Sequence, residues 1–215
     1  MGIILISIAI LLSPMIRRRY SRWGATNDEL RQLLPGDQLV PEPKTKITCA
    51  LDIEASCEQV WSWLLQLGYR RGGWYSYDLL DNQGEPSAVK IIPQYQHLHI
   101  DDLIVATPSG SISFIVDTID QHKSLVFRNT TAVKNNQRAD RRKSSSGNHF
   151  KASLSFVLSD SDKDYCRLVY RRRVNWNKGI INNLYYRFIM EPVSFIMTRK
   201  MLLGIRARTI ASIGR

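Results

Sequence analysis

The residues best suited to chemistry lie in one stretch, residues 71–78, which reads Arg-Gly-Gly-Trp-Tyr-Ser-Tyr-Asp. Two adjacent glycines let the backbone adopt positive φ angles and approach another surface closely, while tryptophan and tyrosine combine apolar area with a polar tip. Arg71 and Asp78 add one charge of each sign at the two ends. This composition is typical of the wall of a ligand pocket. It also suits a tight turn followed by core aromatics, so both interpretations stay open.

Five charged residues stand among apolar neighbours, in motifs where a charge is rarely buried without a partner. Such groups can orient a ligand or act as general acid and base, and Asp78 and Glu191 are the candidates for catalysis. Structural ion pairs that fix the loop and a helix would require the same charges. The five residues are Arg71, Asp78, Asp102, Glu191 and Arg199.

A run of three arginines lies in a segment with the alternation of a strand. Successive side chains of a strand point to opposite faces, so Arg172 should face away from Arg171 and Arg173. If its face is the concave one, Arg172 can meet the anionic or polar head of an otherwise apolar ligand. The sequence does not say which face is inside.

No familiar catalytic, nucleotide-binding or metal-binding motif occurs in the sequence. His97 and His99 share one face of an extended segment, which we interpret as a surface pair rather than a metal site. The three cysteines form neither a CxxC motif nor an even set, so we expect reduced, mostly buried thiols and neither a disulfide nor a zinc site. We therefore expect no metal and no cofactor.

The composition predicts one globular domain with a basic surface. The chain has 215 residues, 44% of them hydrophobic, and a formal charge of +11. Such a charge favours polyanions, either nucleic acid or an anionic membrane. Most of it lies at residues 17–22, directly after an apolar run at 3–12, and around a polar insertion at 132–148. This placement favours a membrane surface, and we expect no specific nucleic-acid partner.

The N-terminal apolar run predicts a membrane anchor formed by residues 3–16. A helix over residues 1–16 would be about 24 Å long, which is short of a hydrocarbon core of about 30 Å. Ser13-Pro14-Met15 does not resemble a signal-peptide cleavage site. The arginines that follow favour a domain facing the cytoplasm. A helix packed on the domain and a mis-assigned start codon are the alternatives.

Local signals divide the chain after this anchor (1–19) into a strap and a domain. Thr26 and Glu29 form the pattern of a capping box, and the prolines at 41 and 43 then predict an extended strap, so residues 20–45 should cover a surface. Strict alternation from Lys46 predicts a strand. Ser56 and Gln59 form a second capping box, before a helix that should end at Gly68.

The rest of the chain reads as consecutive antiparallel hairpins followed by a long helix. The helix should run from Ile180 to Ile213 and break at Glu191-Pro192, because proline lacks an N–H and clashes with the preceding turn. The insertion at 132–148 should be mobile. The expected strands are 88–92, 103–106, 112–119, 125–129, 150–158 and 165–176, and the expected core stripe of the helix is Leu184, Phe188, Phe195, Leu202 and Ile205.

This order predicts an α+β helix-grip fold, in which a curved antiparallel sheet wraps a long C-terminal helix, with an apolar N-terminal helix in addition. Several segments between residues 22 and 208 resemble a largely uncharacterised group of the START-like, SRPBCC superfamily (polyketide cyclase/dehydrase and lipid transport). These segments are Arg22–Thr26, Leu34–Asp37, Val60–Gly68, Arg71–Asp78, Glu191-Pro192 and Met197–Ile205.

The resemblance implies a helix-grip domain over 46–213 with a hydrophobic-ligand cavity between sheet and helix. The sequence departs from the family pattern in two places. Asp101 stands where a glycine usually precedes the aspartate that we match to Asp102, and the stretch 132–148 resembles an added basic loop. The family name does not fix an activity, because one fold carries many functions.

We predict that the protein binds, or binds and transfers, a hydrophobic small molecule such as a lipid, isoprenoid or polyketide-like compound. A cyclase or dehydratase acting on such a molecule is the alternative, and would require a buried carboxylate of shifted pKa near Trp74 or Tyr77. A basic surface protein that binds polyanions is a third class. The expected ligand contacts are Trp61, Arg71, Trp74, Tyr75, Tyr77, Asp78, Arg172 and Glu191.

Overall fold

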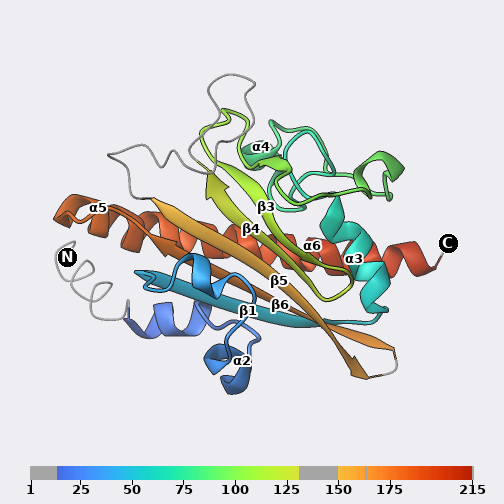
Figure 1. Ribbon diagram of the computed structural model, residues 1–215, viewed down its shortest axis with the longest axis horizontal. Helices are drawn as coiled ribbons and strands as arrows, with labels where there is room; N and C mark the ends of the chain where they lie inside the picture. The colour runs from blue at the N-terminus through green and yellow to red at the C-terminus, as the bar shows by residue number, and fades with distance from the viewer. Residues whose placement is uncertain (1–13, 131–149, 163, 215) are drawn as a thin grey trace, which may run out of the picture.

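Alternating apolar residues between positions 45 and 175 form six strands of one antiparallel sheet (Figure 1). The computed structural model describes residues 14–130, 150–162 and 164–214. The strands follow the order β1-β6-β5-β4-β3-β2, so the first strand lies beside the last. They are β1 (Thr45–Ile53), β2 (Leu103–Val105), β3 (Ser113–Asp120), β4 (Ser124–Thr130), β5 (Lys151–Asp162) and β6 (Tyr165–Asn175).

The predicted strand at 88–92 is wrong, whereas the other predicted strands are confirmed within a few residues. Ala88 donates its N–H to the carbonyl of Gly72, and Ile92 donates its N–H to the side chain of Gln66. The segment therefore bonds to the loop and helix before it instead of to a strand. A 3₁₀ helix, η2 (Pro93–Tyr95), follows it.

Helices form where capping signals predicted them. The boxes at Thr26 and Ser56 are both present. The helix after Ser56 ends earlier than predicted, at Leu65, because Gly68 has a φ of 126° and pairs with Gly73 in a β-bridge instead of capping the helix. The helices are α2 (Asn27–Arg31), η1 (Asp37–Leu39), α3 (Cys57–Leu65), α4 (Asp78–Asp81), α5 (Ile180–Tyr185), the π-helical η3 (Tyr186–Met190) and α6 (Glu191–Ile213).

The strap after α2 covers one face of the sheet and is bound there by two arginines of β6. Arg171 contacts Asp37 at 2.7 Å and donates a further hydrogen bond of 2.8 Å to the carbonyl of Gln32. Arg173 lies 3.3 Å from the other oxygen of Asp37 and donates to the carbonyl of Val40. Two buried guanidinium groups thus share one buried carboxylate, which satisfies charges that would otherwise be costly to bury.

The opposite face of the sheet carries the hydrophobic core. Tyr170 of β6 packs there with the nearly inaccessible Leu202 and Ile205 of α6. Trp63 of α3 belongs to the same hydrophobic core. The structure is thus a mixed α+β fold, with an antiparallel sheet packed against a long C-terminal helix, which is consistent with the helix-grip expectation (Figure 1).

Cys57 and Cys166 form a disulfide, so the prediction of three reduced thiols is wrong. The start of α3 packs against the start of β6, which brings the two Cα atoms within 5.0 Å although 109 residues separate them in sequence. Counting cysteines could not reveal this tertiary contact. Cys49 remains a free thiol, and burial raises its pKa to about 12.

The C-terminal helix changes at the predicted position without an interruption: the π-helical η3 ends at Met190, and Pro192 stands in the first turn of α6. The expected core stripe is wrong for Leu184 and Phe188, which are 52% and 45% exposed. A π turn holds an extra residue, so η3 rotates α6 relative to α5. In addition, α5 extends past the end of the sheet (Figure 1), and none of its residues is buried.

The N-terminal helix is described only from residue 14 to residue 20, where Tyr20 stacks on Phe195 of α6 with 5.2 Å between ring centroids. Residues 3–13 of the predicted anchor and the insertion at 132–148 lie outside the described residues. Among the helices that the structure does describe, none has both the length and the apolar character needed to cross a membrane.

The backbone at Asp101 has a conformation that favours glycine, the residue that the resemblance led us to expect there. Its φ is 71°, in the left-handed region that glycine adopts without strain. A glycine at this position would therefore suit the turn before β2. The aspartate that replaces it lies 3.5 Å from Arg128 of β4.

Candidate functional site

The aromatic loop, residues 71–78, closes tightly against α6. Tyr75 has a φ of 56°, is 1% exposed, and donates its hydroxyl to the carbonyl of Trp63 at 3.2 Å. Gly204 makes this approach possible, because a Cβ atom at 204 would overlap the carbonyl oxygen of Tyr75. The predicted close backbone approach is real. It serves contact between loop and helix at this point.

Arg208 holds the loop from one turn further along α6. Its guanidinium lies 4.7 Å from the centroid of the Tyr75 ring, and its Nε donates to the carbonyl of Ala88 at 2.7 Å. Burial raises the pKa of Tyr75, which keeps the phenol neutral. These contacts give Tyr75 a structural role and place a cation at the edge of the segment 88–91.

The other predicted residues of the loop point in different directions. Arg71 donates to the carbonyl of Leu65 at 2.8 Å and stacks over Tyr95 at 4.6 Å, so it ties the loop to α3 and η2. Trp74 is buried edge-on against Phe114, whereas Tyr77 is 41% exposed. The loop therefore does not present its aromatic rings to one shared cavity.

Asp78 is a structural acceptor. Its two oxygens accept hydrogen bonds from the N–H and the hydroxyl of Ser87 at 3.1 and 2.5 Å, and Ser87 Oγ in turn accepts the N–H of Tyr75. This arrangement engages both carboxylate oxygens with Ser87, which lies outside the loop, and ties Ser87 to Tyr75.

Asp81, three residues later, is the carboxylate that sequence reasoning missed. It is buried, and neither of its oxygens has a hydrogen-bond partner of ordinary geometry among the described residues. Burial, followed by the charge of Asp78, raises its pKa to about 6. Its i+3 spacing from Asp78 was the available signal, because residues so spaced share one face where the chain is helical.

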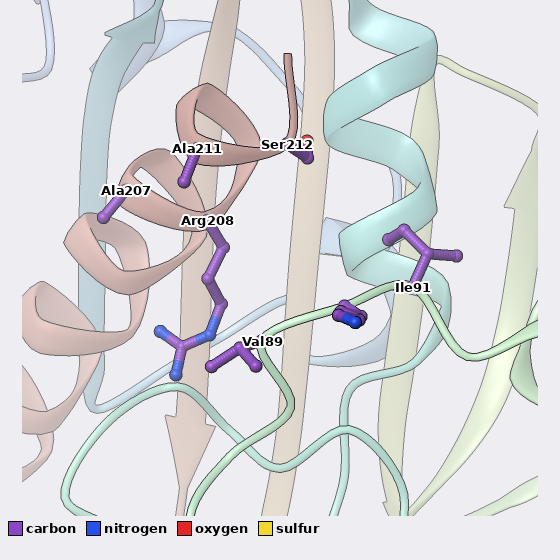
Figure 2. A pocket seen from close by; sticks show the side chains of 7 residues that line it. Val89, Ile91, Ala207, Arg208, Ala211 and Ser212 are labelled. Atoms are coloured by element: carbon purple, nitrogen blue, oxygen red, sulfur yellow. The ribbon is translucent and has the colours of Figure 1, made fainter. Parts of the chain in front are cut away.

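A groove of about 600 Å³ lies between the segment after Ser87 and the last turns of α6. Figure 2 shows Val89 and Ile91 on the segment after Ser87 and Ala207, Arg208 and Ala211 on the helix, with the Arg208 side chain extending toward Val89. Its wall is thus apolar, with small side chains on α6 that leave space. Lys90 and Ser212 complete the lining.

Two cations give this groove its polarity, since Lys90 and Arg208 both line it. None of the predicted ligand contacts is among the lining residues, although Arg208 touches Tyr75. The sequence carried little signal for the groove. Small residues and a basic residue spaced along a helix are common on any exposed face.

Arg172 and Glu191 share a second polar region, at the other end of α6. Arg172 faces away from Arg171 and Arg173, as alternation predicted. The structure adds that its side is the inner one, which it shares with the core residue Tyr170. Burial lowers its pKa, against the influence of Tyr170 and Glu191. Glu191 is 2% exposed and pairs with Arg17 at 2.8 Å.

Two atoms of this region have no hydrogen-bond partner of ordinary geometry among the described residues, namely Nη1 of Arg172 and Oε2 of Glu191. Burial, followed by the charge of Glu191, raises the pKa of Tyr20 beside them to about 12. A buried donor and a buried acceptor of opposite charge suit a water molecule or a small polar group between them. The structure therefore unites two of the predicted ligand residues.

Trp61 lies apart from both regions, in a smaller pocket of about 290 Å³ that His97 and His99 also line. The two histidines are exposed, as expected of a surface pair. Across residues 14–130, 150–162 and 164–214, no three His, Cys, Asp or Glu side chains gather closely enough to hold a metal ion.

Comparison with solved structures finds chains of similar fold at low identity. A hypothetical protein of Helicobacter pylori, jhp0584, gives a TM-score of 0.52 at 10% identity, over 82% of this chain and 95% of its own. A protein from Arthrobacter aurescens gives 0.43 at 12% identity, over 77% and 86%. DynU16, described as a putative protein in the dynemicin biosynthetic locus, gives 0.40 at 10% identity, over 74% and 46%.

No family model and no curated protein matches the sequence. The likeness to jhp0584 shows the fold alone.

Proposed function

We propose that this protein is a helix-grip protein of the START-like type that binds a hydrophobic small molecule with an anionic head. The observation that carries the proposal is the groove beside the last turns of α6, with its apolar wall and two cations. A lipid, an isoprenoid acid and a polyketide-like acid all have this chemistry.

The size and lining of the groove support the proposal. Its volume of about 600 Å³ falls within the range of about 300–1,000 Å³ typical of small-molecule sites. Val89, Ile91 and the alanines of α6 offer apolar contact, while Lys90 and Arg208 offer positive charge. An ammonium and a guanidinium at the edge of an apolar wall match a carboxylate or phosphate head on an apolar body.

The groove replaces the interior as the proposed position of the ligand. Between the sheet and the second half of α6, the space expected to form the cavity holds Tyr75, Leu202 and Ile205, which are at most 1% exposed. Side chains packed in this way leave a ligand better access beside the helix than beneath it.

Catalysis on such a molecule is the second candidate, and Asp81 favours it. The enzyme hypothesis required a buried carboxylate of shifted pKa near Trp74 or Tyr77, and Asp81 meets this requirement. Its backbone N–H bonds to the carbonyl of Tyr77. Asp81 does not line the groove, however, so binding without chemistry remains the preferred function.

Attachment to a membrane is the remaining part of the proposal, with residues 3–16 as the attachment segment. The disulfide between Cys57 and Cys166 is typical of proteins in oxidising compartments. It argues against the cytoplasmic orientation that the arginine cluster favoured, and we leave that orientation out of the proposal.

A fluorescent fatty acid tests the binding proposal. We expect cis-parinaric acid to bind the full chain with a rise in emission. Lys90→Glu should weaken binding about fivefold, as expected for a charge reversal of about 1 kcal/mol near the surface. The methyl ester of the same acid is the matched control, because it keeps the apolar body and lacks the charge. If both probes respond alike to Lys90→Glu, the anionic-head part of the proposal is wrong.

A further inference from the structure

An exposed apolar face covers α5, η3 and the start of α6. Ile180 and Ile181 are 79% and 83% exposed, and the exposure continues along the helix to Ile196. Soluble surfaces carry scattered apolar residues, but a contiguous set of this size marks an interaction site. The face consists of Ile180, Ile181, Leu184, Tyr185, Phe188, Ile189, Val193 and Ile196, and we call it the α5 face.

The π turn keeps this face continuous across the helix break. Apolar residues up to Ile189 follow helical spacing, and the extra residue of η3 rotates the helix by about one residue position, or about 100°. Because of this rotation, Val193 and Ile196 fall on the side already occupied by Leu184 and Phe188. A regular α-helix would have turned these two residues aside.

The chain around the α5 face is almost free of negative charge. Between Lys178 and Lys200 the only acidic residue in the sequence is Glu191, which is buried and paired with Arg17. Exposed positive side chains occur in this segment and in the N-terminal one, where no acidic residue occurs between residues 14 and 24. The exposed Glu42, whose carbonyl accepts a hydrogen bond from Asn175, is a negative charge near the start of α5. The exposed cations are Arg18, Arg19, Lys178, Arg187, Arg199 and Lys200.

The N-terminal segment reaches the same end of the molecule. Arg17 contacts Glu191, and Tyr20 stacks on Phe195, so residues 14–20 lie against the start of α6. Met15 and Ile16 are themselves exposed, at 72% and 56%. The described chain therefore begins at the same end of the molecule as the α5 face.

We propose that the α5 face docks on an anionic lipid bilayer, lying in the plane of its surface. Helices of this kind bury an apolar side at the boundary of head groups and acyl chains, while lysine and arginine bind the anionic heads. A protein partner or second copy would equally cover apolar area, but the nearly uniform positive rim would repel a second copy of itself. The inference does not depend on the ligand-binding proposal.

A fluorescent label placed directly on the face tests docking whatever the N-terminus does. Variants of the full chain with one added cysteine, Ile181→Cys or Ile196→Cys, would carry a nitrobenzoxadiazole label at that position. Ser161→Cys, at the far end of β5, is the matched control. These are exposed positions, so the variants should fold. The labelled proteins are mixed with vesicles of phosphatidylcholine alone, or of phosphatidylcholine and phosphatidylglycerol in equal parts.

We expect a blue shift and a several-fold rise in emission for the two labels on the α5 face, and no change at position 161. The response should be larger with phosphatidylglycerol and should weaken with added salt. Equal responses at all three positions, or none, would overturn the proposal. A blue-shifted emission that grows with protein concentration without vesicles would show a second copy instead. A blue-shifted emission that depends neither on the protein concentration nor on the presence of vesicles would show that the chain covers its own face.

Discussion

The two ends of α6 differ in what their side chains meet. At the end that contains Gly204, the helix contacts the aromatic loop through its backbone, and Tyr75, Leu202 and Ile205 are almost inaccessible. At the end that contains Glu191, buried polar atoms lack partners and the outer side is an exposed apolar face. About 26 Å separates Glu191 from Arg208 along the helix.

This difference separates structure from function along one helix. The conspicuous motif at 71–78 belongs to the closed end, where its glycines and rings complete a packed core and its charges bind loop neighbours. The positions with functional potential lie where that packing stops: the groove beside Arg208 and the α5 face. Unusual composition alone therefore identified a structurally demanding region, and the neighbouring surface carries the proposed binding.

The largest expected effect comes from opening the closed end. The disulfide joins α3 to β6 there and closes a loop of 109 residues. The double variant Cys57→Ser, Cys166→Ser should lose about 2–5 kcal/mol in free energy of unfolding, because long cross-links restrict the unfolded chain most. Urea unfolding measures this loss, with Cys49→Ser as a control for the loss of a thiol. An unchanged stability in the double variant would show that the two cysteines do not staple the fold.

A methyl group at position 204 should also disturb the closed end. Gly204→Ala gains about 1 kcal/mol of helix propensity, but its Cβ would overlap the carbonyl oxygen of Tyr75, and we expect a net loss of about 2 kcal/mol. Gly214→Ala, where an added Cβ meets nothing within 4 Å, is the matched control. Thermal unfolding of both variants compares them. A stabilised Gly204→Ala variant would contradict the tight contact between loop and helix.

At the other end, removal of Arg17 should cost somewhat less. Glu191 would keep a buried charge without its ion-pair partner, and since Arg17 is partly exposed we expect a loss of about 1–2 kcal/mol for Arg17→Ala. The exposed Arg18 is the control, and Arg18→Ala should change the free energy of unfolding by less than about 0.5 kcal/mol. Equal effects of the two substitutions would mean that the Arg17–Glu191 pair does not fasten the N-terminal helix.

The pH dependence of stability tests Asp81. Its folded pKa of about 6 lies above the value near 3.9 of an unfolded chain, so the folded state holds the proton more strongly. This contribution is complete below about pH 4 and is lost as the pH rises through about 6. Asp81→Asn should therefore gain about 1–2 kcal/mol between pH 4 and pH 7 relative to the wild type. The exposed Asp120→Asn should show no such gain, and equal pH profiles for Asp81→Asn and the wild type would refute the raised pKa.

Local parts of the fold could be predicted from sequence because their causes are local. Thr26 and Ser56 formed their capping boxes, and Pro192 started a new helix, since each depends on residues a few positions away. The disulfide and the contact of Arg208 with Tyr75 join segments more than 100 residues apart, which no short pattern encodes. Leu184 and Phe188 had the spacing of a core stripe, but spacing cannot show whether anything lies opposite.

The candidate site followed the same division. Alternation predicted that Arg172 faces away from Arg171 and Arg173, and the structure confirms it. The groove could not be predicted, because it depends on how the irregular segment 88–91 folds back against small residues of α6. That segment had the composition of a strand, but the N–H of Ala88 bonds to the carbonyl of Gly72 and the N–H of Ile92 bonds to the side chain of Gln66 instead of to a neighbouring strand.

Native mass spectrometry of the full chain, extracted from its own membrane, tests the central claim that a hydrophobic molecule occupies the groove. Ala211→Trp should fill the groove from α6, whereas Ile210→Trp adds the same side chain at an adjacent exposed position that does not line it. The account predicts a bound small molecule on the wild type and on Ile210→Trp, and its loss from Ala211→Trp. A molecule retained equally by all three proteins, or found on none of them, would contradict it.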